Sequence, residues 1–177
     1  MRLVFWRTAA PALALALLLV GSRAAVASQC AAIRTNIVTG YALTGCTSPI
    51  GVCTTGTMSS PTLLGNTSFS ARNVVQGLSP DLLVYSGELV LTFSDGTITI
   101  HDQGILNSTT AYYFEVQRVV SGTGAYARAY GLLTSRGVST PTGFQGVLSG
   151  TICYPSTDAA RYPSPPANHP PGNYNTP

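Results

Sequence analysis

Hydrophobic and polar residues alternate with a period of two along the middle of the chain. Across residues 83–93 the odd-numbered positions share one face and the even-numbered positions share the other. The alternation stops at Asp95-Gly96 and resumes over residues 97–102. Asp-Gly between two alternating runs is typical of a two-residue type I′ turn, so the pattern predicts a β-hairpin.

The register of this hairpin decides which side chains meet. With Asp95 and Gly96 as the loop, Phe93 is expected opposite Ile98, and His101 falls on the polar face. A Ser-His-Asp triad would then lack an inward-facing base. The opposite face collects the residues expected in the core, together with one acid: Leu89, Leu91, Phe93, Ile98, Ile100 and Asp102.

Six further stretches have the composition of strands, and none reads as a long amphipathic helix. Six to eight strands joined by short turns are typical of a β-sandwich or a closed up-and-down barrel. The four stronger stretches are residues 62–75, 112–120, 125–135 and 143–154, and the two weaker ones are residues 33–43 and 51–58.

The N-terminal segment has the pattern of a secretory signal. Basic residues precede an apolar run at residues 9–20, which is shorter than the roughly 20 residues that a membrane-spanning helix needs. The small residues Ala25 and Ala27 then fit a cleavage site, so we expect residues 1–27 to be removed before Ser28. The mature protein is therefore expected to be exported, with no membrane span after cleavage.

The C-terminal segment, residues 154–177, has seven prolines among 24 residues and almost no aliphatic side chains. Such a composition cannot form a core and is typical of extended, disordered chain. We expect a disordered Pro-rich tail, and a stalk that contacts a partner is the functional alternative.

Export changes how the four cysteines are interpreted. An even number in an exported chain favours two disulfides over a metal site, because the spacing of Cys46 and Cys53 with no nearby histidine matches no common zinc pattern. Four cysteines allow three pairings. We favour Cys46 with Cys53, which closes a short loop, and Cys30 with Cys153, which ties the mature N-terminus to the last expected strand. No metal is expected.

Charge is scarce, at only 8% of the residues. Three of the nine basic residues lie in the expected signal sequence, which leaves six arginines against six acids and a net charge near zero. Binding to nucleic acid and polybasic docking to membranes both need clustered positive charge, so neither is expected.

Residues 122–131, Gly-Thr-Gly-Ala-Tyr-Ala-Arg-Ala-Tyr-Gly, resemble the G-[ST]-G-x-[FY]-x-x-A-x-G segment of the allene oxide cyclase barrel superfamily, which includes the dirigent proteins. The resemblance covers residues 63–152. It implies a closed antiparallel barrel of about eight strands with an apolar cavity, in a family where some members cyclise or guide small hydrophobic substrates. We therefore expect a barrel domain at residues 62–153, after a disulfide-tied segment at residues 28–61.

The same ten residues also fit the G-x-G-x-x-G/A dinucleotide pattern. That pattern needs a preceding parallel strand, a following helix and an acid about 20 positions further on. The sequence offers none of these, so no cofactor is expected.

Polar residues on an inward face are the candidates for chemistry. Asp102 and Glu115 would have raised pKa values if they face the interior, and each is otherwise a solvated residue near a strand end. Arg128 either stacks on tyrosine at the surface or pairs with Glu115 inside. Catalytic residues stay unassigned. The candidate ligand-binding residues are Glu115, Asp102, Arg128, Tyr126, Phe93, Leu91 and Ile100.

Two function classes follow. The first is a secreted barrel that binds a small hydrophobic molecule, with isomerase or cyclase activity as the enzymatic form. The second is a non-catalytic extracellular or envelope-associated protein whose Pro-rich tail makes the contacts. An interior cavity above about 300 Å³ would favour the first, and a filled interior the second. An oligomer is compatible with both.

Overall fold

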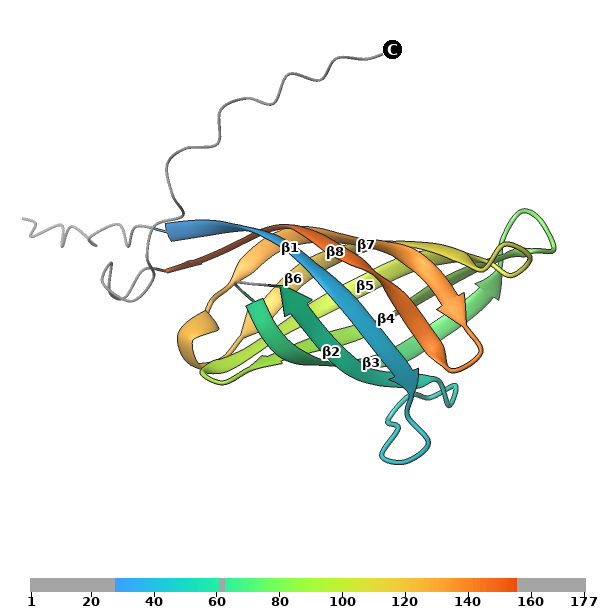
Figure 1. Ribbon diagram of the computed structural model, residues 1–177, viewed down its shortest axis with the longest axis horizontal. Coiled ribbons are helices and arrows are strands. Elements are labelled where there is room, and N and C mark those ends of the chain that lie inside the picture. Colours follow the sequence, from blue (N-terminus) through green and yellow to red (C-terminus); the bar gives the residue numbers. More distant parts are fainter. Residues whose placement is uncertain (1–27, 61–62, 156–177) are drawn as a thin grey trace, which may run out of the picture.

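A computed structural model of the chain describes residues 28–60 and 63–155, which form one closed β-barrel (Figure 1). The expected signal sequence lies outside the described residues, as does the expected tail after Pro155. The strands are β1 (Ser28–Tyr41), β2 (Cys53–Ser60), β3 (Leu63–Gln76), β4 (Leu82–Phe93), β5 (Gly96–Asn107), β6 (Tyr112–Gly122), β7 (Tyr130–Thr140) and β8 (Gly143–Pro155).

The barrel has the simplest connectivity. Each strand pairs antiparallel with its neighbour in sequence, and β8 pairs with β1 to close the sheet. The expected eight-stranded up-and-down barrel is therefore confirmed. The segment at residues 28–60 does not stand apart, because β1 and β2 are two of the eight strands. Figure 1 shows the start of β1 and the end of β8 together at one end of the barrel.

Both cysteine pairs predicted from the sequence lie at disulfide distance. Cys30 and Cys153 are opposite each other on β1 and β8, with their sulfur atoms 2.07 Å apart. The Cys46 and Cys53 sulfur atoms are 2.13 Å apart and close the loop between β1 and β2. Such pairs are compatible with an extracellular protein.

Among residues 28–60 and 63–155, no helix is long and apolar enough to cross a membrane.

The turn between β4 and β5 differs from the expected one by one position. It holds Ser94 and Asp95, so Phe93 lies opposite Gly96 and the predicted loop of Asp95 and Gly96 is wrong. The reason is a contact from a distant segment, since a side chain at Gly96 would overlap the carbonyl oxygen of Thr123. Glycine is needed here for close approach and not for the turn itself.

The predicted faces survive this correction because the shift moves each pairing by two residues, which preserves the alternation. Leu91 and Ile100 are fully buried, and Phe93 packs against the same core. The Tyr126 ring lies 4.7 Å from the Phe93 ring and 6.0 Å from the Tyr154 ring, centroid to centroid. These rings fill the barrel at the end where the Ser94 turn lies.

The expected strand at residues 125–135 is wrong in its first five positions. A 3-10 turn, η1 (Gly124–Tyr126), comes first, and β7 begins only at Tyr130. Gly124 has a φ of 57°, and its Cα faces the Asp95 carbonyl oxygen so closely that a Cβ would overlap it. The Ala125 amide donates a 3.0 Å hydrogen bond to that oxygen. The glycine motif thus docks η1 onto the β4–β5 turn.

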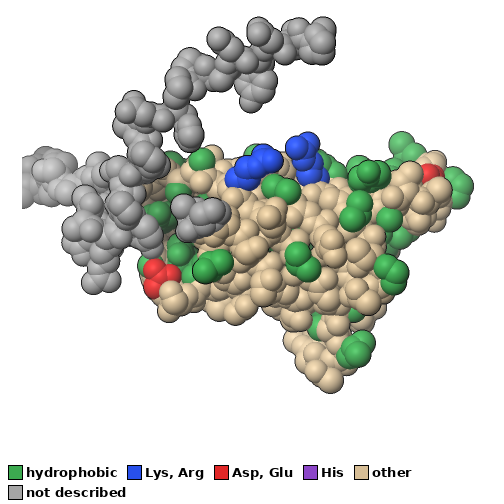
Figure 2. Space-filling model, in the orientation of Figure 1, with side chains coloured by type: hydrophobic (Ala, Val, Ile, Leu, Met, Phe, Trp, Pro, Cys, Tyr) green, Lys and Arg blue, Asp and Glu red, His purple; other side chains and the backbone are tan. Residues whose placement is uncertain are grey.

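Charged side chains are sparse on the surface, and Figure 2 shows a face with few of them among scattered hydrophobic side chains. Among the described residues the ion pair is Arg72 with Glu88, at 3.0 Å and largely exposed. Every basic side chain in the described ranges is exposed: Arg34, Arg72, His101, Arg118, Arg128 and Arg136.

Candidate functional site

A cavity of about 50 Å³ lies inside the barrel, toward the end where β1 finishes and β8 begins. This volume is well below the roughly 300 Å³ at which sites for drug-sized ligands begin. The apolar core fills the other half of the interior. The polar and aromatic side chains that line the cavity are Thr39, Thr54, Phe69, Tyr85, Asp102, Tyr113, Glu115, Gln117, Ser135 and Phe144.

Two carboxyl groups share one amide in this cavity. The Gln117 Nε2 donates a 3.0 Å hydrogen bond to Asp102 Oδ2 and a 2.9 Å hydrogen bond to Glu115 Oε2. Gln117 and Glu115 are two apart on β6, so they point to the same side of the sheet, and Asp102 lies opposite Gln117 on β5. The alternation of two neighbouring strands therefore brings both acids to one donor.

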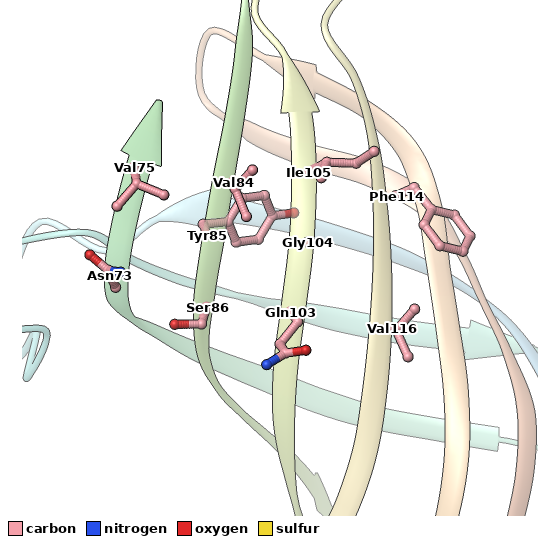
Figure 3. Close-up of a pocket in the computed structure, with 10 residues that line it drawn as sticks. All are labelled: Asn73, Val75, Val84, Tyr85, Ser86, Gln103, Gly104, Ile105, Phe114 and Val116. Carbon is pink, nitrogen blue, oxygen red and sulfur yellow. The ribbon is translucent and has the colours of Figure 1, made fainter. Parts of the chain in front are cut away.

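A tyrosine from the next strand supplies another donor. The Tyr85 hydroxyl donates a 2.7 Å hydrogen bond to Glu115 Oε1, although β5 lies between their strands. The ring passes over Gly104, which pairs with both residues and has no side chain in the way. Figure 3 shows the Tyr85 ring extending from β4 toward Gly104. Both oxygen atoms of Glu115 are thus hydrogen-bonded.

Two buried acceptor atoms of this cluster have no hydrogen-bond partner. Asp102 is 2% exposed and Gln117 is 1% exposed, yet Asp102 Oδ1 and Gln117 Oε1 have no hydrogen-bond partner. Tyr113 and Ser135 bond to each other at 3.2 Å between their oxygen atoms. A buried polar atom without a partner costs about 1–3 kcal/mol, so the cavity retains two acceptors that water or a ligand would satisfy.

Burial makes the two acids hard to ionise. Loss of water contact, followed by repulsion from Glu115, raises the pKa of Asp102 to about 8. Burial also raises the pKa of Glu115, and hydrogen bonds from Tyr85, Ser135 and Gln117 oppose this rise. Asp102 is buried, Glu115 beside it is half-buried, and one charge opposes a second, so the pair holds at least one proton at neutral pH.

The two tyrosines beside the pair stay neutral over the same range. Burial raises the pKa of Tyr113 to about 12. Burial and then the Glu115 charge raise the pKa of Tyr85 further. As the pH rises, the two acids therefore lose their protons before either tyrosine does.

The residues predicted to bind a ligand fall into separate places. Asp102 and Glu115 line the cavity, so both face the interior of the barrel and neither is a solvated residue at a strand end. Leu91 and Ile100 belong to the apolar core, and Phe93 packs against it.

The glycine-motif residues lie elsewhere again. Tyr126 packs against the core from η1, and Arg128 is exposed beyond η1 with a φ of 65°. Arg128 lies between η1 and β7, so it shares no strand face with Tyr126 and Tyr130, and it does not line the cavity with Glu115.

The sequence reasoning missed the neutral members of the cluster. Gln117 is uncharged and carries no signal of its own, although its spacing of two from Glu115 places it on the same face. Tyr85 is an odd-numbered position of the run at residues 83–93, so the alternation places it on the face of Leu91, but no local signal indicates that its hydroxyl reaches across a strand to β6.

A second hollow lies on the outer wall over β3 to β6. It is an open groove of about 360 Å³, and Figure 3 shows the side chains around it. Its lining has no charged residue. Five half-exposed or exposed apolar side chains dominate it: Val75, Val84, Ile105, Phe114 and Val116.

The donor set of the interior does not suggest a metal. Within the described ranges, no three His, Cys, Asp or Glu side chains are grouped so that they would hold a metal ion. The cluster instead suits proton exchange and hydrogen bonding, with one acid protonated and another able to accept a proton.

Neither a family model nor a curated protein matches this chain, so the resemblance to the allene oxide cyclase barrels stays a prediction.

Proposed function

We propose that the chain is an exported barrel that binds the polar end of a small hydrophobic molecule in its interior cavity. The observation that supports this proposal is the acid pair of Asp102 and Glu115, which is kept inside the barrel beside two unpartnered acceptor atoms. A purely structural barrel gains nothing from such a pair, because apolar side chains of similar size would be more stable there. Groups held at a cost to stability cluster at functional sites.

Acid–base chemistry is the activity that suits these groups. A protonated Asp102 can donate a proton to one atom of a ligand, and an ionised Glu115 can accept one from another, with Gln117 between them. Such transfers are steps of isomerisations and cyclisations, and the resemblance to the allene oxide cyclase barrels leads to the same expectation. The proposed activity, where the protein is an enzyme, is of the isomerase or cyclase type.

The cavity volume limits the ligand. About 50 Å³ has room for a few non-hydrogen atoms only, since one water needs about 10–15 Å³ on this measure. The rest of a larger molecule would extend toward the loop closed by Cys46 and Cys53. Phe144 and Thr39 are the half-buried lining residues at that end, and they would contact it.

Native mass spectrometry of the protein purified from its own host tests the proposal. We expect a retained small molecule on the wild-type protein and its loss from Glu115→Gln, which removes a charge and keeps the shape. Glu88→Gln is the matched control, because Glu88 is on the outer face of β4 and pairs with exposed Arg72. Equal retention by wild type and Glu115→Gln would contradict the interior site.

A structural role is the second candidate, and the sizes of the two hollows favour it. The interior is mostly filled, whereas the outer groove is about seven times larger than the cavity and is apolar. On this alternative the barrel is a stable extracellular head, and contacts are made by the outer wall and the Pro-rich tail. A protein free of any retained molecule, with a Glu115→Gln variant that is more stable than wild type, would favour this role.

A further inference from the structure

We propose that the interior cavity selects a small organic ammonium ion, that is, a protonated primary amine with a short apolar group. This inference rests on the proposed function, because it specifies the ligand of the same cavity. It is argued from charge, from hydrogen-bond donors and from the rings that line the cavity.

The charge argument is that the acid pair has no counter-ion from the chain. The sequence contains no lysine, and every arginine and histidine of the described residues is exposed. Asp102 and Glu115 therefore lack a positive partner inside the barrel. A buried negative charge without a partner is costly, so a small cation that enters the cavity is favoured over an anion or a neutral molecule.

The hydrogen-bond argument is that the side chains around the acid pair have no donor to spare. Gln117 donates to both acids, so its amide has no donor to spare, and its Oε1 can only accept. Tyr85 donates to Glu115, and the Tyr113 hydroxyl is engaged with Ser135. The unfilled atoms are Gln117 Oε1 and Asp102 Oδ1, which are both acceptors when Asp102 is ionised.

An ammonium group matches these unfilled atoms. It offers three N–H donors and one positive charge, whereas an alcohol offers one donor and no charge. A quaternary ammonium has the charge but no donor. The site should therefore distinguish these three chemical groups even when their apolar parts are alike.

Aromatic rings provide the remaining contacts. Phe69, Tyr85, Tyr113 and Phe144 line the cavity, and the Tyr113 and Phe144 rings meet edge to face with centroids 5.5 Å apart. Ring faces attract cations, and the ring edges suit a short alkyl chain. The small volume excludes a bulky amine from the cavity.

Binding should release a proton. The free pair holds at least one proton at neutral pH, and a bound cation favours the fully ionised pair, so a carboxyl proton passes to solvent. The titratable groups that face the pair are Tyr85 on β4 and Tyr113 on β6, and both stay neutral. Affinity should thus rise with pH until the amine itself loses its proton, near pH 10 for an alkylamine.

Isothermal titration calorimetry of the full exported chain, with both disulfides formed, tests this inference. The probes are propylammonium, 1-propanol, tetramethylammonium and propionate, at about pH 8, which is near the pKa of Asp102. We expect saturable binding of propylammonium, and binding about tenfold or more weaker for the other three, because charge-assisted hydrogen bonds are lost. Buffers of different ionisation enthalpy should report up to one proton released.

Two substitutions and one control locate the site. Glu115→Gln and Asp102→Asn should each weaken propylammonium binding about tenfold or more, and Glu88→Gln should leave it unchanged. If a variant fails to fold, the wild-type protein alone still tests the inference, because its affinity for propylammonium must rise between about pH 6 and pH 9.

Several results would overturn the inference. One is that 1-propanol binds as tightly as propylammonium, and another is that potassium chloride or ammonium chloride gives the same binding heat as propylammonium. The inference is also wrong if the affinity for propylammonium does not depend on pH, or if propylammonium does not bind at all. If Glu115→Gln still loses a neutral molecule retained from the host, the proposed function stands and only the cationic ligand is wrong. If wild type retains and binds nothing, both fail.

Discussion

The Tyr85 hydroxyl donates a 2.7 Å hydrogen bond to Glu115 Oε1 directly over Gly104, which pairs with Tyr85 on one side and with Glu115 on the other. At this level of the barrel β4 supplies the donor and β6 supplies the acceptor, and the glycine on β5 between them leaves room for the tyrosine ring. The bond holds Glu115 in place beside Gln117. The position of Glu115 in the acid pair therefore depends on the absence of a side chain at Gly104.

Gly104→Ala should remove this arrangement. An added methyl group would overlap the Tyr85 ring, so the ring must move and release Glu115. We expect the free energy of unfolding to fall by about 1–3 kcal/mol, as is usual when a filled interior is overpacked. Urea denaturation measures this loss.

Gly40→Ala is the matched control for that substitution. An added methyl group there would lie 3.6 Å from its nearest neighbour, the Thr142 carbonyl oxygen, which is an ordinary contact. If Gly40→Ala and Gly104→Ala lower the free energy of unfolding equally, the loss at Gly104 is not caused by overlap with the Tyr85 ring.

Stability should fall as pH rises through the neutral range. Asp102 has a pKa of about 8 in the folded protein and an ordinary value of 3.8, so between about pH 4 and pH 8 the folded state binds more protons than the unfolded state. The free energy of unfolding then decreases with pH, by about 1.4 kcal/mol for each unit of pKa shift at most. Thermal denaturation across this range measures the slope.

Asp102→Asn should flatten that slope and stabilise the protein above pH 8. Asp81→Asn is the contrasting variant, because hydrogen bonds from Ser79 and Asn107 help to lower the pKa of this half-buried acid. Its contribution is present above the ordinary pKa and is lost only as pH falls, so it should not alter the slope between pH 5 and pH 8. If the free energy of unfolding of the wild-type protein does not change with pH in this range, Asp102 does not hold a proton in the folded state.

Arg128→Gly should stabilise the protein. Arg128 has a φ of 65°, in the left-handed region that costs a residue with a side chain about 1–2 kcal/mol and costs glycine little. We expect a gain of up to about 1 kcal/mol by urea denaturation, because glycine also adds entropy to the unfolded chain. Arg118 is exposed in the middle of β6, so Arg118→Gly should instead destabilise the protein. A loss of stability in both variants would argue against strain at Arg128.

The two disulfides should contribute unequally. Cys30 and Cys153 are 123 positions apart, whereas Cys46 and Cys53 are seven apart. On the chain-entropy model the first is worth about 5 kcal/mol and the second about 2.5 kcal/mol. Paired cysteine-to-serine variants and chemical denaturation compare them, and a larger loss from the Cys46 and Cys53 pair would contradict the loop-length argument.

The strands could be predicted from the sequence because alternation is a local signal. A turn displaced by one residue did not alter the inward face, since Leu91 and Ile100 kept their side of the strand. The placement of Gly96 could not be predicted, because its reason is the Thr123 carbonyl oxygen on a segment that packs against it from elsewhere. Small residues before Tyr130 alternate like a strand but form a turn, for the same non-local reason.

The site was predictable only in its charged members. Asp102 and Glu115 stood out because acids on an inward face are unusual. Gln117 and Ser135 did not stand out, since neutral polar residues are common on strands. Their role depends on which strands are neighbours, and this follows from the closed barrel rather than from local sequence.

Carbon-13 NMR of the carboxyl carbons, followed from pH 3 to pH 10, tests most directly whether the barrel keeps a buried acid pair. We expect one Asp carboxyl to remain protonated above pH 7 and to titrate near pH 8, and its signal to be absent from Asp102→Asn. A spectrum in which every carboxyl group has lost its proton by about pH 5, as unperturbed acids do, would contradict the account.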